Sequence, residues 1–180
     1  DRLRSRGLGD VYKRQVWNTD KINLDRNKNN KLDYILIEGE QTHFDAVRRT
    51  NGFLENSQNL PLNQLTNLSA DWQRNLASVK FSKLDTSIIQ SAEAIICNND
   101  DMALGAWEAL EEKGCTEVQV VGIDGIEEVR ELVDEDKILG SVLCDTKLHA
   151  KALMQFIDVL AFHNGSVEKL NLENERLNSV

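Results

Sequence analysis

The sequence lacks several features that would assign it to a common functional class. Its three cysteines are odd in number and have no CxxC spacing, which argues against a disulfide framework and a zinc site. No apolar run is long enough to span a membrane. Basic residues are outnumbered 21 to 30 by acidic ones, giving a net charge of −9, so the chain is a poor partner for nucleic acid.

Catalytic motifs are also missing. The chain has no GxSxG sequence, no phosphate-binding loop and no HExxH motif. The pair His43 and Asp45 keeps acid–base catalysis as a minor alternative. We expect a protein that is not an enzyme, because a binding site explains the same residues with fewer assumptions.

Residues 1–15 differ from the rest of the chain. The stretch "LRSRGLGDVYKRQ" is basic, interrupted by glycine and without an apolar period, and it resembles the translation of a transposase-based sequencing adapter. We therefore expect residues 1–15 to be a non-native scar rather than a native basic arm. The remaining residues hold 16 basic and 28 acidic side chains, a net charge of −12. On this interpretation the natural N-terminus, with any signal segment or anchor, lies outside this chain.

From residue 32 onward, short apolar runs alternate with segments of helical spacing. The apolar runs predict strands at 32–39, 62–68, 92–99, 118–125 and 138–145. Helices are predicted at 42–56, 71–81, 100–114, 126–135 and 147–165. Thr42 is the predicted N-cap of the first helix, and Gly114 is the predicted stop of the third. The apolar faces are expected to hold Phe44, Val47 and Phe53 in the first helix, and Trp72, Leu76 and Val79 in the second.

This alternation predicts the α/β class, with a parallel sheet covered by helices on both faces. Such sheets bind ligands beyond the carboxyl ends of their strands. Polar clusters lie at four of these ends: "EGEQTHFDAVRR", "CNND", "GIDG" and "LCD". Any one cluster is best explained by helix capping. The four together favour a site for a polar small molecule.

The side chains of these clusters suit a ligand with many hydroxyl groups. His43, Asp45 and Arg49 can share one helix face. Together with Asn99 and Asp124 they offer donors and acceptors of every kind. Trp72 is either a platform that stacks on a sugar ring or an ordinary core aromatic, and its spacing leaves the two readings about even.

The stretch "DRNKNNKLD", residues 25–33, alternates oxygen-bearing side chains like a calcium loop. It fails the EF-hand pattern twice, with Asn30 in place of the required glycine and Leu36 in place of the bidentate glutamate. It could bind calcium only if a distant carboxylate completed the site, and Glu93 is the candidate. The residues alone slightly favour a solvated turn.

The motifs "DRNKNNKLDYILIEGEQTHFDAVRRT", "AIICNNDDMALGAWEAL", "VVGIDG" and "GSVLCD" resemble the periplasmic D-galactose/D-glucose-binding proteins. These are sugar receptors of ABC importers with the Rossmann-like fold of the type 1 periplasmic binding proteins. The resemblance runs from about Trp17 to about Gly165. The first motif is the specific one, because it joins a calcium loop to a sugar-contact motif.

The resemblance implies two sets of site residues. The sugar contacts would be His43, Asp45, Arg49, Trp72, Asn99, Asp124 and the position of Cys144. A structural Ca²⁺ would be held by Asp25, Asn27, Asn29, the carbonyl of Lys31, Asp33 and Glu93. The family has asparagine where this chain has Cys144, so we expect a lost sugar contact or a shifted preference there.

The resemblance also implies an incomplete protein. Residues 16–144 would form the C-terminal sugar-binding lobe without its first strand, with the calcium loop at 25–33. Residues 145–180, which include a helix at about 146–163, would return to an N-terminal lobe that is mostly absent. A chain holding half of a cleft should bind sugar poorly on its own.

The function that follows is that of a monomeric substrate-binding protein in a periplasm or on an extracellular membrane face, with a lipid anchor as one form. Its expected partners are galactose or glucose, the permease subunits of an ABC importer and a chemoreceptor. The alternative is the effector-binding core of a LacI-type repressor, which shares the fold. A weak calcium loop discriminates between them, because cytosolic calcium is too scarce to fill it.

Overall fold

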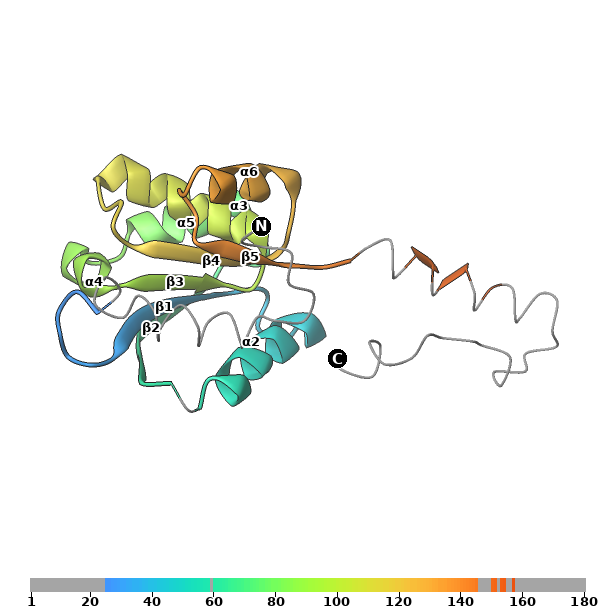
Figure 1. Ribbon diagram of the computed structural model, residues 1–180, viewed down its shortest axis with the longest axis horizontal. Coiled ribbons are helices and arrows are strands. Elements are labelled where there is room, and N and C mark those ends of the chain that lie inside the picture. Colours follow the sequence, from blue (N-terminus) through green and yellow to red (C-terminus); the bar gives the residue numbers. More distant parts are fainter. Residues whose placement is uncertain (1–24, 59, 146–149, 152, 155–156, 158–180) are drawn as a thin grey trace. The chain divides into compact units, whose positions relative to one another are not determined.

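The chain forms a five-stranded parallel sheet in the order β2-β1-β3-β4-β5 (Figure 1). The computed structural model describes residues 25–58, 60–145, 150, 151, 153, 154 and 157. The strands are β1 Leu32–Glu38, β2 Leu62–Ser69, β3 Ala94–Cys97, β4 Gln119–Asp124 and β5 Gly140–Leu143. Every strand pair is parallel. The predicted parallel α/β sheet is therefore confirmed.

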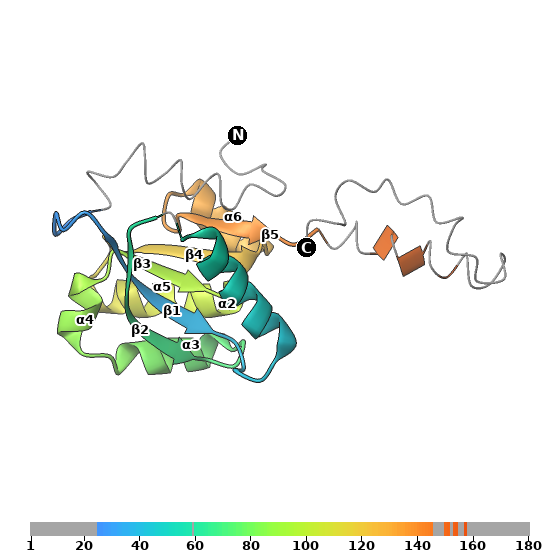
Figure 2. The same ribbon diagram turned by 90° about the horizontal axis from the view of Figure 1, so that it is seen from below.

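Helices cover both faces of this sheet, as the alternation predicted. They are α2 Phe44–Asn56, α3 Arg74–Ser82, α4 Thr86–Ser91, α5 Asp100–Lys113 and α6 Glu127–Asp134. Helix α2 lies on one face, and α3, α5 and α6 lie on the other (Figures 1 and 2). The short helix α4 was not predicted, because its six residues are too few to show a period. Asp85 caps it by accepting a hydrogen bond from the Ser87 amide.

Strand β1 separates two apolar cores, because successive side chains of a strand point to opposite faces. Ile35 and Ile37 pack into the larger core beneath α3 and α5. Tyr34 and Leu36 pack into the smaller core with Phe53 of α2. The burial of five consecutive residues in β1 is typical of a central strand in a parallel sheet.

Helix α2 begins differently from the prediction. His43, and not Thr42, is its N-cap, and the His43 side chain accepts a hydrogen bond from the Asp45 amide. Phe44 and Val47 were predicted to pack, but they are 67% and 44% exposed. The helix instead buries the small residues Ala46 and Thr50 together with Phe53. Among the described residues, α2 is the one helix on this face, and it buries a narrow strip that leaves its first-turn apolar residues outside.

The second predicted helix begins three residues late. Asp71 and Trp72 adopt left-handed backbone angles, with φ of 49° and 66°, so α3 begins only at Arg74. Trp72 therefore lies in the loop and not on the helix. Val79, predicted to be buried, is 50% exposed, and α3 packs through Ala77 and Phe81.

The chain divides into two units, Asp1–Leu143 and Cys144–Val180. The predicted helix at 147–165 lies mostly outside the described residues, as does the predicted scar at 1–15. Residues 150, 151, 153, 154 and 157 are helical, in agreement with that prediction. No helix in the described ranges is both long and apolar enough to cross a membrane.

Helices α3 and α5 approach closely at Gly105. A side-chain methyl at this position would overlap the backbone carbonyl of Arg74, and neither backbone can give way easily. We expect Gly105→Ala to lower the free energy of unfolding by about 1–3 kcal/mol, measured by urea denaturation followed by circular dichroism. Gly52→Ala in α2 is the matched control, because nothing lies within 4 Å of the added methyl. It should stabilise the chain by up to about 1 kcal/mol. Equal destabilisation at both positions would contradict the close helix contact.

Candidate functional site

Polar side chains from several strand ends meet at one edge of the sheet, as the parallel topology requires. Arg49 of α2 is central to this cluster. One guanidinium nitrogen lies 3.0 Å from the Asp124 carboxylate at the end of β4, and the other donates to the Asn98 carbonyl at 2.6 Å. The side chains of Arg49 and Asp124 are only 26% and 31% exposed. A partly desolvated ion pair thus joins α2 to the ends of β3 and β4.

The indole of Trp72 lies beside this ion pair. The Arg49 guanidinium carbon is 5.4 Å from the Trp72 ring centroid. The indole also lies directly against Gly39 at the end of β1, where any Cβ would overlap the ring. Trp72 is half-buried against the main core. Trp72 therefore packs in part as a core aromatic and also borders the polar cluster, while its stacking on a sugar ring stays a prediction.

His43 lies at the same edge and contacts Trp72 edge-on, with ring centroids 5.4 Å apart. Its Nδ1 accepts the hydrogen bond from the Asp45 amide at 3.2 Å. A neutral imidazole that accepts at Nδ1 carries its proton on Nε2. The exposed His43 ring therefore keeps an N–H donor for a ligand.

Asn99 performs the structural role that polar residues at such junctions often have. Its Oδ1 accepts from the Met102 amide at 3.0 Å and caps α5, while its Nδ2 donates to the Trp72 carbonyl at 3.3 Å. Asn99 is thus brought to the cluster, where it ties β3 to the Trp72 loop. It is 7% exposed.

Two further residues that were predicted to contact the sugar are Asp45 and Cys144. The Asp45 side chain is exposed on the first turn of α2. Cys144 is a free, half-buried thiol that begins the second unit of the chain. As sugar contacts, all seven predicted residues stay sequence predictions.

The sequence patterns did not single out Asn98 and Thr50. The buried Asn98 Oδ1 accepts from the Gly39 amide at 3.1 Å and from the Thr50 hydroxyl at 3.3 Å. These bonds fix the end of β1 against the start of α5 and orient the carbonyl that Arg49 binds. The only signal was the doublet "NN" after an apolar strand, which does not reveal which asparagine points inward.

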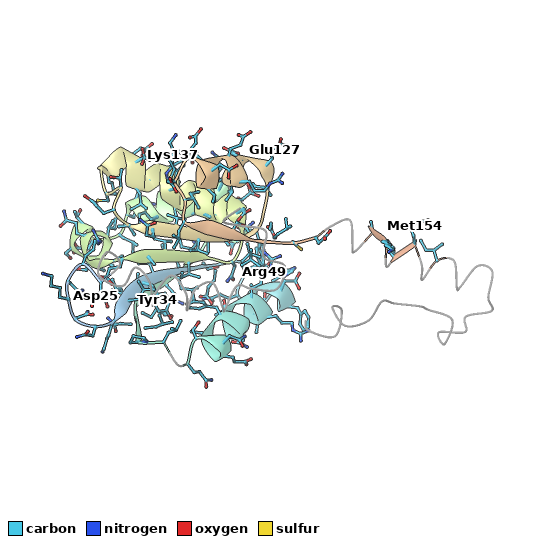
Figure 3. All side chains as sticks on the ribbon, in the orientation of Figure 1. Asp25, Tyr34, Arg49, Glu127, Lys137 and Met154 are labelled. Carbon is cyan, nitrogen blue, oxygen red and sulfur yellow. The ribbon has the colours of Figure 1, made fainter. Side chains whose placement is uncertain are left out.

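The loop at residues 25–33 lies at the opposite end of the sheet, as the labels of Asp25 and Arg49 in Figure 3 show. Glu93, which precedes β3, reaches this loop across 60 residues of sequence. Its Oε1 accepts from the Arg26 amide at 2.5 Å, and its Oε2 accepts from the Asp33 amide at 3.0 Å. Glu93 is 2% exposed. Glu93, which was predicted from the sequence to reach this loop, therefore contacts it.

The loop concentrates negative charge away from water. Asp25 and Asp33 are 7% and 3% exposed, and with Glu93 they bring three buried carboxylates to one end of the sheet. The side-chain amides of Asn27 and Asn29 both donate to Asp33 Oδ2, at 2.6 and 2.8 Å. Lys28 and Asn30 take left-handed angles, with φ of 59° and 63°, which turn the chain back on itself.

This donor set fits a calcium ion in its chemistry, because carboxylate, amide and carbonyl oxygens are the ligands that Ca²⁺ prefers. Within the described part of the chain, no three His, Cys, Asp or Glu side chains are grouped so as to hold a metal by themselves. The predicted set also draws on Asn27, Asn29 and the Lys31 carbonyl. In this structure the Asn27 side-chain oxygen accepts a hydrogen bond from the Asn29 backbone amide. The Asn29 side-chain oxygen accepts one from the Lys31 backbone amide.

The chain matches known proteins over most of its length. The family profile of the periplasmic binding protein domain matches residues 23–164. The chain is 33% identical over 163 residues to the D-galactose/methyl-galactoside binding periplasmic protein MglB of Haemophilus influenzae, covering 89% of this chain and 48% of that protein. It is 32% identical over 112 residues to the D-allose-binding periplasmic protein of Escherichia coli, covering 59% and 35%. Both relatives are named as binding proteins and not as enzymes, in line with the sequence prediction.

The fold also matches solved structures. An ABC transporter solute binding protein from Burkholderia multivorans superposes with a TM-score of 0.65 at 21% identity, covering 80% of this chain and 50% of that one. The chain spans at most about half of the length of these proteins. The chain therefore belongs to the periplasmic binding protein family and forms part of a type 1 periplasmic-binding-protein fold.

Proposed function

We propose that this chain is the C-terminal, sugar-binding lobe of the substrate-binding protein of an ABC sugar importer. The observation that carries the proposal is the Arg49–Asp124 ion pair beside the Trp72 indole, at the carboxyl ends of four parallel strands. Support comes from the relatives, which are named for D-galactose or methyl-galactoside and for D-allose.

The chemistry of the cluster suits a monosaccharide. Each sugar hydroxyl donates one hydrogen bond and accepts others, so it needs both kinds of partner. Arg49 and the Nε2–H of His43 donate, the Asp124 and Asp45 carboxylates accept, and Trp72 offers a ring for the apolar face of the sugar. D-Galactose and D-glucose are the proposed ligands, because the "HFDAVRR" motif resembles the contact motif of that branch of the family.

We also propose that the protein acts outside the inner membrane, in a periplasm or lipid-anchored to a surface, with permease subunits and a chemoreceptor as partners. The second candidate is the effector core of a LacI-type repressor. The acidic loop against Glu93 favours the receptor, since a weak calcium site is useful only where calcium is abundant.

The sugar proposal is tested by titrating the chain with D-galactose, D-glucose, D-allose and myo-inositol into the millimolar range. The wide range is needed because a second lobe would normally close over the sugar. Binding is followed by tryptophan fluorescence and by the NMR signals of the indole N–H groups. We expect the Trp72 signal to shift with D-galactose or D-glucose.

Trp72→Ala should weaken this binding by roughly tenfold, because stacking and its buried area are lost. Trp107→Phe is the matched control, since Trp107 lies on α5 beside Lys137 and should leave the affinity unchanged. A Trp72 signal that stays still with all four sugars would overturn the sugar proposal.

We also propose that the loop at 25–33 holds a structural Ca²⁺ with Asp25, Asn27, Asn29, the Lys31 carbonyl, Asp33 and Glu93. The ion would neutralise the buried carboxylates and fix the entry to β1. Because a metal that binds only the folded chain stabilises it by mass action, calcium at 100 times its dissociation constant should add about 2.7 kcal/mol to the free energy of unfolding.

The calcium proposal predicts that thermal unfolding shifts upward on adding Ca²⁺ and downward on adding a chelator. Glu93→Gln should abolish the shift, because it removes the charge of one proposed ligand. Glu117→Gln is the control, since the Glu117 carboxylate is 64% exposed, lies 4.0 Å from the Arg26 guanidinium and is not a proposed ligand. A shift of equal size in the Glu93→Gln variant would contradict the proposed ligand set.

Cys144 carries a separate prediction on sugar affinity. A thiol is a weak donor and a weak acceptor, so the hydrogen bonds that asparagine makes in the family are lost or replaced. Cys144→Asn should tighten galactose or glucose binding by roughly twofold to tenfold, measured by the same titration, with Cys115→Asn as the control for a thiol elsewhere. An unchanged affinity would remove Cys144 from the site.

A further inference from the structure

A buried carboxylate lies directly behind the sugar site. Asp100 is 0% exposed at the start of α5. Its Oδ1 accepts from the Ser141 hydroxyl of β5 at 2.6 Å, and its Oδ2 accepts from the Ile126 amide at 2.9 Å. The space for it comes from Gly122 of β4, where any Cβ would overlap the Asp100 carboxylate oxygen. The carboxylate thus spans from α5 across β4 to β5.

The turn held by this carboxylate carries Asp124 and has an unusual backbone. Asp124 has φ of 132° and Gly125 has φ of 71°, so two successive residues are in regions that side chains rarely adopt. The Gly125 amide donates to the Ser141 hydroxyl at 3.0 Å. Both amides that follow Asp124 are therefore held, one by Ser141 and one by Asp100. A strained residue persists only where its surroundings fix it.

Holding the turn with a buried, charged Asp100 carboxylate is unfavourable for the free energy of folding. Burial raises the pKa of its carboxyl group above the usual range, and the charge of nearby Asp124 adds to that rise, despite the hydrogen bonds that lower it. The charged form of Asp100 therefore costs folding stability instead of adding to it. A role in shaping the neighbouring site explains this buried charge better than a role in stability.

We propose that Asp100 and Ser141 are positioning residues: they clamp the turn at residues 124–126 so that the Asp124 carboxylate faces Arg49 and can receive the sugar. Neither residue touches the sugar. They act through Asp124, whose direction is set by the strained backbone that they hold. The proposal rests on the proposed function for its sugar-binding half, while the geometry of the Arg49–Asp124 pair can be tested without any sugar.

The competing explanation is purely structural. Ile126 is the N-cap of α6 and provides no side-chain cap, so Asp100 and Ser141 could serve only to satisfy the amides at the start of that helix. Both explanations involve the same hydrogen bonds to these amides. They differ in whether Asp124 must be present for the clamp to matter.

The test is a double-mutant cycle on the full chain with Ser141→Ala, Asp124→Ala and the combined variant, each titrated with D-galactose. We expect Ser141→Ala to weaken binding by roughly threefold to tenfold when Asp124 is present, and to have no further effect when Asp124 is already alanine. Ser141→Thr, which keeps the hydroxyl, should restore most of the affinity. Gly122→Ala, which displaces the Asp100 carboxylate but leaves its chemistry intact, should act like Ser141→Ala.

A second readout separates this proposal from the sugar proposal. The NMR signals of the Arg49 guanidinium report its pairing with Asp124, with no sugar present. They should change in Ser141→Ala as they do in Asp124→Ala, and remain as in the wild type in Ser141→Thr. If the wild-type chain binds no sugar while these signals change as expected, the proposed function fails and the clamp stands.

Either of two results would contradict the proposal that Asp100 and Ser141 position Asp124. One is an Arg49 guanidinium signal unchanged by Ser141→Ala. The other is an equal loss of affinity from Ser141→Ala with and without Asp124, which would show that the hydroxyl supports the fold in general and not Asp124.

Discussion

The parallel pairing of five strands is the constraint on which the rest of this structure depends. It brings the carboxyl ends of β1, β3 and β4 to one edge, and so it places Arg49, Asn98 and Asp124 within reach of one another although 75 residues separate the first from the last. An antiparallel order would have distributed these loops over both ends of the sheet. The candidate site therefore depends first on the topology of the sheet and only then on the individual side chains.

The same two central strands serve both ends of the molecule. β1 contains Asp33 of the acidic loop near its start and is followed by Gly39, which lies against Trp72. β3 is preceded by Glu93, which binds the loop, and followed by Asn98 and the cap of α5. A change in the loop would therefore act on strands that also carry the candidate site. The proposed structural ion would therefore stiffen the candidate site without contacting its ligand.

Two residues of the candidate site have backbone conformations that side chains rarely adopt. Trp72 and Asp124, two of the proposed sugar contacts, are among the few non-glycine residues with positive φ among the described residues. Each is held by partners from other elements: the Asn99 amide binds the Trp72 carbonyl, and the clamp of Asp100 and Ser141 binds the turn after Asp124. The directions of the Trp72 and Asp124 side chains are therefore set by unusual backbone angles. Hydrogen bonds from polar side chains of other elements hold those backbone angles.

The sequence by itself determined the class of fold, the order of most elements and the positions of the polar junctions, because strand and helix periods are local properties. It also identified Glu93 as the carboxylate that reaches the loop, with help from the family resemblance. Only the tertiary structure decided that His43 caps α2, that Trp72 lies in a strained loop, and that Asn98, Thr50, Asp100 and Ser141 support the site. These roles depend on which side chains face inward and on contacts between residues far apart in sequence, and no local period encodes either of them.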